Sequence, residues 1–165
     1  MTIIIKNKET LLIDDFKFKC SVGKNGFSKD KKEGDNKTPI GVFKLGSIYY
    51  RKDRIKKLIS KLKKIKIKKN MGWCDDPKSK NYNKLIKIKK NLEISYEKLF
   101  RKDSKYDLFI LIKYNYRKTY KNKGSAIFLH LTKNYLPTQG CIAVKKKDFF
   151  IINKLINKNT KIKIT

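Results

Sequence analysis

The only histidine of the chain and one of its three cysteines are the residues best suited to do chemistry together. His130 ends an apolar segment, and Cys141 follows 11 residues later, directly after Gly140. A thiol nucleophile needs a base that generates or stabilises its thiolate, and imidazole is the usual partner. The intervening loop is long enough to fold the two side chains back within hydrogen-bond reach, and Gly140 allows close approach of the backbone. Backbone N–H groups around Cys141 can then hold a developing oxyanion.

Both residues also have ordinary structural explanations. A histidine at a strand end is usually a surface or capped residue, and a lone cysteine is usually a small core hydrophobe. The three cysteines form no Cys-x-x-Cys pair, and an odd number leaves at least one thiol free. We expect Cys74 to be a buried hydrophobe, with a disulfide to Cys141 as the alternative. A zinc site needs closely spaced ligands that the chain does not offer, so no metal is expected.

Two segments surround the pair, GSAIFLH at residues 124–130 and PTQGCIA at residues 137–143. They resemble the catalytic segment of the L,D-transpeptidases of the YkuD type. An earlier segment, GDNKTPIGVF at residues 34–43, is similar to the G-D-x-x-T-P-x-G-x-F sequence of that family. Segments at 72–77, 82–83, 99–103 and 106–107 resemble a small subfamily without an obvious signal peptide. The resemblance extends from about residue 17 to the C-terminus.

The resemblance assigns roles within the signature segment. Cys141 matches the nucleophile, His130 matches the base, and Gly140 matches the glycine that precedes the cysteine. Thr138 takes the position of a serine or threonine and is expected near the substrate. Gln139 replaces the second histidine of the signature, so His130 must be the only imidazole of the site.

Several positions depart from the family pattern. Leu131 follows His130 where many members have serine, and the resemblance implies that the backbone carbonyl there orients the imidazole. Ala143 and Val144 stand where an arginine commonly follows the cysteine. Arg101 is the candidate to replace that arginine in recognising a substrate carboxylate, and an ion pair with Asp103 is its alternative role.

Segments typical of the subfamily supply further candidates for the substrate pocket. They are Trp73 and Asn115, together with Asp75, Asp76 and Tyr114. The alternatives are local, with Trp73 as a core aromatic and residues 75–77 as an Asx-type turn. Asp75 and Asp76 are not expected to form a glycosidase pair, because adjacent residues of an extended chain point to opposite faces.

The resemblance implies an acyl transfer in cell-wall cross-linking or remodelling. The Cys141 thiolate would attack a carbonyl in a peptidoglycan stem tetrapeptide, terminal D-Ala would leave, and an amine on a second stem would resolve the thioester. Peptidoglycan stem peptides are the expected partners, and no cofactor is needed. Resolution by water would make the protein an L,D-carboxypeptidase, which is the closest alternative.

The charge admits a second class of function. Lys and Arg number 44 against 14 Asp and Glu, a formal charge of +30 that attracts polyanions. Only four of the 44 are arginines, the residue that specific nucleic-acid readers use most. We therefore expect solvated lysine faces and no specific nucleic-acid partner. A basic polyanion-binding protein with a vestigial cysteine–histidine pair is the non-enzymatic alternative.

The hydrophobic pattern favours strands. We expect strands over residues 2–6, 16–20, 42–45, 47–50, 107–114, 124–131, 141–144 and 161–165, with an amphipathic helix over 148–156. We expect a loop over residues 71–77 and a short helix over residues 96–102. Within the basic run 56–69, alternation over 62–68 favours a half-buried strand over a basic membrane-surface helix. Residues 1–165 are expected to form one domain, a mainly β mixed sandwich of the YkuD type with one C-terminal helix.

The expected location is left open. No apolar run approaches the ~20 residues of a transmembrane helix. The first residues, MTIIIK, have no basic head and no cleavage site, so no signal peptide is visible. The family resemblance nevertheless implies the cell envelope or periplasm, because the usual substrate lies outside the cytoplasmic membrane.

Overall fold

The computed structural model describes residues 1–165 and consists mostly of strands. In chain order the elements are β1 (Thr2–Asn7), β2 (Thr10–Ile13), β3 (Phe16–Lys19), β4 (Phe27–Ser28), β5 (Thr38–Pro39), β6 (Gly41–Tyr50), β7 (Lys64–Lys66), β8 (Met71–Cys74), β9 (Leu85–Lys87), β10 (Tyr96–Lys98), β11 (Leu108–Ile112), β12 (Phe128–Leu131), β13 (Ile142–Val144), α1 (Lys146–Leu155) and β14 (Lys161–Ile164). This arrangement confirms the expected mainly β fold with one C-terminal helix.

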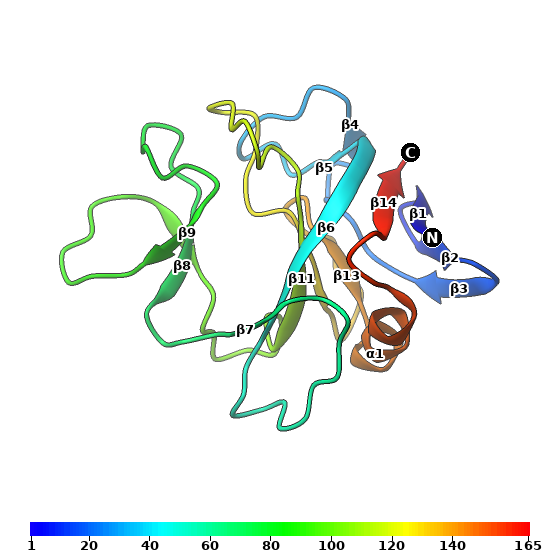
Figure 1. Ribbon diagram of the computed structural model, residues 1–165. Helices are drawn as coiled ribbons and strands as arrows, with labels where there is room; N and C mark the ends of the chain where they lie inside the picture. Colours follow the sequence, from blue (N-terminus) through cyan, green and yellow to red (C-terminus); the bar gives the residue numbers. More distant parts are fainter.

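A large mixed sheet forms the body of the molecule, in the order β13-β12-β11-β6-β14-β1-β2-β3, with β7 beside β6. The long strand β6 joins its two halves, because its first residues pair with β14 and its later residues pair with β11 (Figure 1). Strands β1 and β14 run parallel to each other, so the first and last strands of the chain lie side by side. Strand β12 contains His130, and Cys141 directly precedes β13. These two strands form one edge of the sheet.

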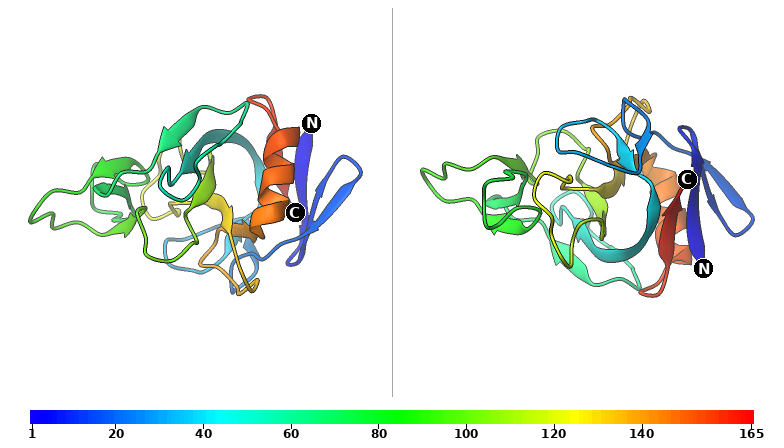
Figure 2. Two further views of the ribbon diagram at one scale, coloured as in Figure 1. Left: turned by 90° about the horizontal axis from the view of Figure 1, so that it is seen from below. Right: turned by 90° about the horizontal axis from the view of Figure 1, so that it is seen from above.

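Two apolar clusters lie on opposite faces of the central strands. In β12, Leu129 and Leu131 belong to the larger cluster, whereas Phe128 belongs to the smaller one. This division follows from the two-residue period of a strand. Helix α1 contributes Phe149 and Ile152 to the larger cluster, and Figure 2 shows it beside the N-terminal strands.

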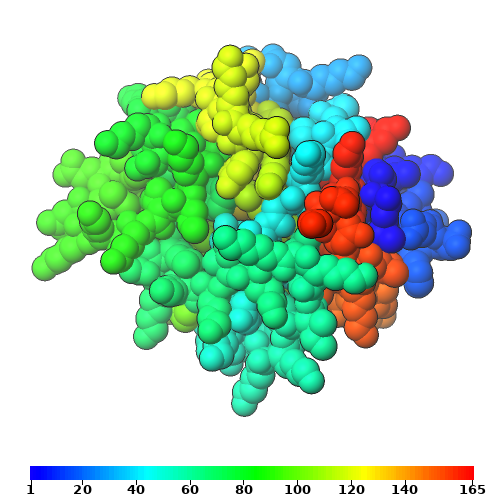
Figure 3. All heavy atoms as spheres, viewed as in Figure 1, coloured from blue at the N-terminus to red at the C-terminus, as the bar shows by residue number.

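The smaller cluster lies between the large sheet and a three-stranded sheet of order β10-β8-β9. Trp73 of β8 packs edge-on against Phe128 of β12, with ring centroids 5.3 Å apart. Figures 1 and 3 show this part of the chain, in green, on the side of the molecule opposite the N-terminal strands. The chemistry expected of His130 and Cys141 must therefore take place on the face covered by the small sheet.

Three expectations about elements were wrong. Residues 71–74 form strand β8 and residues 96–98 form strand β10, in place of a loop and a short helix. The two segments pair with each other, and this long-range pairing overrides a weak local preference in a segment too short to hold a helix by itself. Strand β12 begins only at Phe128, because Gly124 and Ala126 have positive φ angles that interrupt an extended chain.

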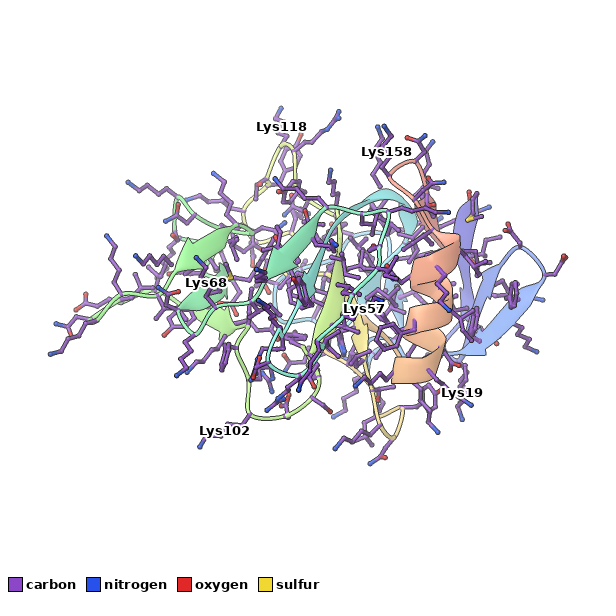
Figure 4. All side chains as sticks on the ribbon, turned by 60° about the horizontal axis from the view of Figure 1, so that its bottom comes forward. Lys19, Lys57, Lys68, Lys102, Lys118 and Lys158 are labelled. Carbon is purple, nitrogen blue, oxygen red and sulfur yellow. The ribbon has the colours of Figure 1, made fainter.

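The basic run contains strand β7, which confirms the alternation, and forms no helix. Lys31 is the only buried lysine of the chain. The six lysines labelled in Figure 4, Lys19 in β3 and five in separate loops, are distributed over the molecule. The positive charge is therefore spread over the surface and is not gathered in one patch. No helix is long and apolar enough to span a bilayer.

Candidate active site

The parallel pairing of β12 with β13 brings the two catalytic candidates to one face. Leu129 pairs with Ile142, and His130 pairs with Ala143. Cys141 immediately precedes β13 and therefore lies beside Phe128, two residues before His130 on the same strand. Because alternate residues share a face, Cys141 and His130 both point to the side of the smaller cluster. The strand register thus brings the two residues to one face, but the expected hydrogen bond between them is not formed, because the thiol binds the Ala126 carbonyl and Nε2 has no partner.

The imidazole of His130 is held in one tautomer. Its Nδ1 lies 2.9 Å from the Leu131 carbonyl, which can only accept, so Nδ1 carries the hydrogen and Nε2 has a free lone pair. This is the contact that the family resemblance implied for position 131. Nε2 is buried and has no hydrogen-bond partner. Burial, together with the positive charge of Lys105, lowers the pKa of His130 to about 3, so the ring is neutral near pH 7.

The thiol of Cys141 is equally enclosed. It donates a hydrogen bond to the Ala126 carbonyl at 3.1 Å and accepts one from the Phe128 N–H at 3.4 Å. Burial, followed by the negative charge of Glu97, raises the pKa of Cys141 to about 12. The resting site therefore holds a neutral thiol beside a neutral imidazole. Thiolate formation requires transfer of the thiol proton to a base, and Nε2 is the free basic nitrogen on this face.

A tight turn presents Cys141. The Thr138 hydroxyl accepts a hydrogen bond from the Gly140 N–H at 3.0 Å and donates one to the Cys141 carbonyl at 2.6 Å. Gly140 has a φ of +136°, and a Cβ at this position would approach the Lys37 carbonyl oxygen to 2.8 Å. Only glycine fits such a position without strain. The Cys141 N–H makes no hydrogen bond within the chain, so it is free to donate to an oxyanion.

Asn83 fixes the segment that holds the thiol. Its side-chain oxygen accepts from the Trp73 indole N–H at 2.9 Å and from the Ala126 N–H at 3.1 Å. Its side-chain NH₂ donates to the carbonyls of Tyr114 and Asn115. Ala126, with a φ of +52°, is thereby held so that its carbonyl receives the Cys141 thiol. Asn83 lies in a segment that resembles the subfamily, but its residue type and position alone predict no role for it.

The catalytic candidates line two cavities of about 330 Å³ each. His130, Thr138 and Ala143 line the first. Cys141, Gln139 and Arg101 line the second, and Lys105 lies at both. The expected ion pair of Arg101 is present, since its guanidinium binds Asp103 at 2.6 Å. Arg101 therefore lines the cavity and at the same time forms the ion pair with Asp103.

Two other candidates lie outside these cavities. Trp73 is buried beneath the site and contacts it through its hydrogen bond to Asn83 and its packing against Phe128. The Asn115 side chain forms its hydrogen bonds within its own loop, to the carbonyls of Tyr120 and Gly124 and to the Tyr120 N–H. Cys74 is a buried free thiol, which matches the expected hydrophobe and not the disulfide.

The family model described as the YkuD L,D-transpeptidase catalytic domain matches residues 1–164. The chain belongs to the YkuD family. No curated protein matches the chain closely enough to count as a relative. In this YkuD domain, the position of the second signature histidine is taken by Gln139, an exposed residue at the edge of the Cys141 cavity. His130 is therefore the one imidazole that the YkuD site contains.

Proposed function

We propose that this YkuD-family protein is a cysteine-dependent L,D-transpeptidase that acts on peptidoglycan stem tetrapeptides. The observation that carries the proposal is that a buried thiol and an imidazole with a free Nε2 lone pair lie on one face of two neighbouring strands. Membership of the family supplies the class of reaction.

In the first half-reaction, the Cys141 thiol gives its proton to Nε2 of His130 while the sulfur attacks a carbonyl at an L-centre of the donor stem. The Leu131 carbonyl, already bound to Nδ1–H, stabilises the imidazolium that forms. The free Cys141 N–H donates to the oxyanion of the tetrahedral intermediate. His130 then protonates the leaving amine of D-Ala, and a thioester on Cys141 remains.

In the second half-reaction, an amine of another stem attacks the thioester and releases the Cys141 sulfur. The product is a cross-linked dimer. Attack by water would instead give a shortened stem, which is the outcome of an L,D-carboxypeptidase. The two activities share the same acyl-enzyme and differ only in the molecule that resolves it.

The test is mass spectrometry of a disaccharide-tetrapeptide incubated with the protein and, in parallel, with Cys141→Ala. We expect loss of D-Ala and formation of a dimer with the wild-type protein, and neither with the variant. Loss of D-Ala without a dimer would identify a carboxypeptidase. An unchanged substrate, with the protein folded and its thiols reduced, would contradict acyl transfer from this donor.

A further inference from the structure

We propose that the cavity beside Cys141 binds the ammonium group of the acceptor and that Glu97 takes its proton. This inference rests on the proposed function and names the groups that would select an amine over water. Three carboxylates, from Glu33, Asp75 and Glu97, line this cavity together with the Cys141 thiol.

These three carboxylates form no ion pair, although Lys98, Arg101 and Lys105 line the same cavity. The chain has 44 Lys and Arg residues for 14 Asp and Glu. Its five ion pairs use the carboxylates of Asp30, Asp35, Asp53, Asp103 and Asp107. None of these lines the Cys141 cavity. The negative charges beside the nucleophile are therefore available to a ligand.

A neutral hydroxyl orients each of the three. Tyr106 donates to Glu97, Tyr82 donates to Glu33, and Ser95 donates to Asp75 at 2.5 Å. A hydroxyl donor fixes the direction of a carboxylate but does not neutralise it, so the charge that remains can attract a cation. The two tyrosines are themselves buried, which makes these arrangements part of the fold.

A separate feature of the cavity also points to a ligand. Ser125 lines it, is 7% exposed, and its hydroxyl has no hydrogen-bond partner. A buried polar atom without a partner is costly, and a bound polar group would relieve that cost. No group of three His, Cys, Asp or Glu side chains is arranged to hold a metal ion. An organic ammonium, which forms several separate hydrogen bonds, fits this spread of acceptors better.

The cations at the cavity leave Glu97 accessible. Arg101 is bound to Asp103, and both Arg101 and Lys105 lie over the Tyr106 ring at 5.5 and 5.4 Å from its centroid. The third cation, Lys98, is exposed. Burial raises the pKa of Glu97, which makes this carboxylate a stronger base than an exposed one.

The acceptor ammonium gives one proton to the Glu97 carboxylate, and the freed nitrogen lone pair forms a C–N bond at the thioester carbonyl. The C–S bond then breaks, and the second proton of the nitrogen passes through His130 to the Cys141 sulfur. The products are an amide, the free thiol and a protonated Glu97, which returns its proton to solvent. Water carries no charge and gains no such attraction from the carboxylates.

The experiment separates acylation from resolution. The acyl-enzyme is formed with a tetrapeptide donor and then partitioned between water and increasing concentrations of Nα-acetyl-lysine amide, whose only charge is a primary ammonium. Mass spectrometry measures the amide and the hydrolysed product. The variants are Glu97→Gln, which keeps an acceptor for Tyr106, and Glu93→Gln, which removes an exposed carboxylate outside the cavity.

We expect Glu97→Gln to raise the amine concentration for half-maximal capture of the preformed acyl-enzyme about 10-fold, the effect of one lost charged hydrogen bond. Glu93→Gln should behave as the wild type. Asp75→Asn should shift capture in the same direction, and it keeps the test valid if Glu97→Gln does not fold.

Unchanged partitioning in both cavity variants would overturn the inference. So would a wild-type acyl-enzyme that the amine never captures. Failure of the wild-type protein to form any acyl-enzyme is a different result, because it would contradict the proposed function itself.

Discussion

At the scale of single residues, burial determines the protonation states of the catalytic candidates. His130 is 2% exposed and Cys141 is 7% exposed, and burial disfavours the charged form of each. A neutral pair is the lower-energy ground state, and charge develops only as the thiol proton moves to Nε2. The hydrogen bond from Nδ1–H to the Leu131 carbonyl fixes the tautomer and orientation of the ring before substrate binds.

The lowered pKa of His130 predicts acid sensitivity. The folded-state pKa of His130 is about 3 and its ordinary value is 6.5. Between these two pH values the imidazole binds a proton in the unfolded chain but not in the folded protein. The free energy of unfolding should therefore fall by about 2 kcal/mol between pH 7 and pH 5 on account of this residue. Urea unfolding at both pH values measures the change.

His130→Gln provides the control, since His130 is the only histidine of the chain. Subtracting the pH dependence of the variant removes the contributions of the carboxylates. Equal pH dependence in the two proteins would show that the imidazole is not buried as described.

Asn83 should prove essential to the site although it touches no substrate. Asn83→Ala removes the acceptor of the Trp73 and Ala126 N–H groups and should lower the free energy of unfolding by about 3 kcal/mol. Acylation should fall with it, because the Ala126 carbonyl would no longer hold the thiol in place. Urea unfolding and the rate of acylation measure the two effects.

Asn91→Ala is the matched control for Asn83→Ala. Asn91 has a φ of +61°, close to the +56° of Asn83, but it is exposed and its side chain makes no hydrogen bond. Its replacement therefore costs only the backbone strain, about 1 kcal/mol. A similar loss in the two variants would contradict a positioning role for the Asn83 amide.

At the scale of elements, the turn before β13 controls the direction of the nucleophile. Gly140→Ala should reduce acylation by about 100-fold, because the new Cβ would clash with the Lys37 carbonyl and displace Cys141. Gly34→Ala shares a positive φ, +75°, but its Cβ would meet nothing within 4 Å. The rate of acyl-enzyme formation should therefore be nearly normal in Gly34→Ala, and a comparable loss in both variants would refute the steric argument.

The sequence predicted the elements whose pattern is local. Alternation located β3, β7 and β14, apolar runs located β1 and β11, and the amphipathic period located α1 within two residues of its start. It failed for β8 and β10, which are short, partly polar and defined by their pairing across the smaller cluster.

The same distinction applies to the site. The types and spacing of His130 and Cys141 predicted the nucleophile and base, whereas Glu97 and Asn83 lie more than 40 residues from Cys141. Tertiary contacts alone bring them to the thiol. Nothing in the local sequence distinguishes Glu97 from an ordinary surface glutamate, and for Asn83 the only signal is the resemblance of residues 82–83 to the subfamily.

At the scale of the whole molecule, exposed lysines are spread over the surface, while three carboxylates without an ion pair lie together with three cations at one cavity. Exposed lysines are screened by salt over about 10 Å, whereas a partly enclosed cavity is screened much less. At saturating donor, acylation should therefore change less than about 2-fold between 50 and 300 mM NaCl. Rapid-quench measurements of the acyl-enzyme test this expectation.

A polyanion-binding protein would behave differently. Its binding to duplex DNA, the probe for this alternative, would be tight at low salt, fall by orders of magnitude as salt rises, and survive Cys141→Ala. Such binding without any acyl transfer would contradict the enzymatic account.

The central claim is that Cys141 carries the acyl group. Intact-protein mass spectrometry with a tetrapeptide donor and no added acceptor, followed by peptide mapping, tests it most directly. We expect one adduct, equal in mass to the donor without D-Ala, on Cys141 and none in Cys141→Ala. An adduct on Cys20 or Cys74, or release of D-Ala that persists in Cys141→Ala, would contradict it.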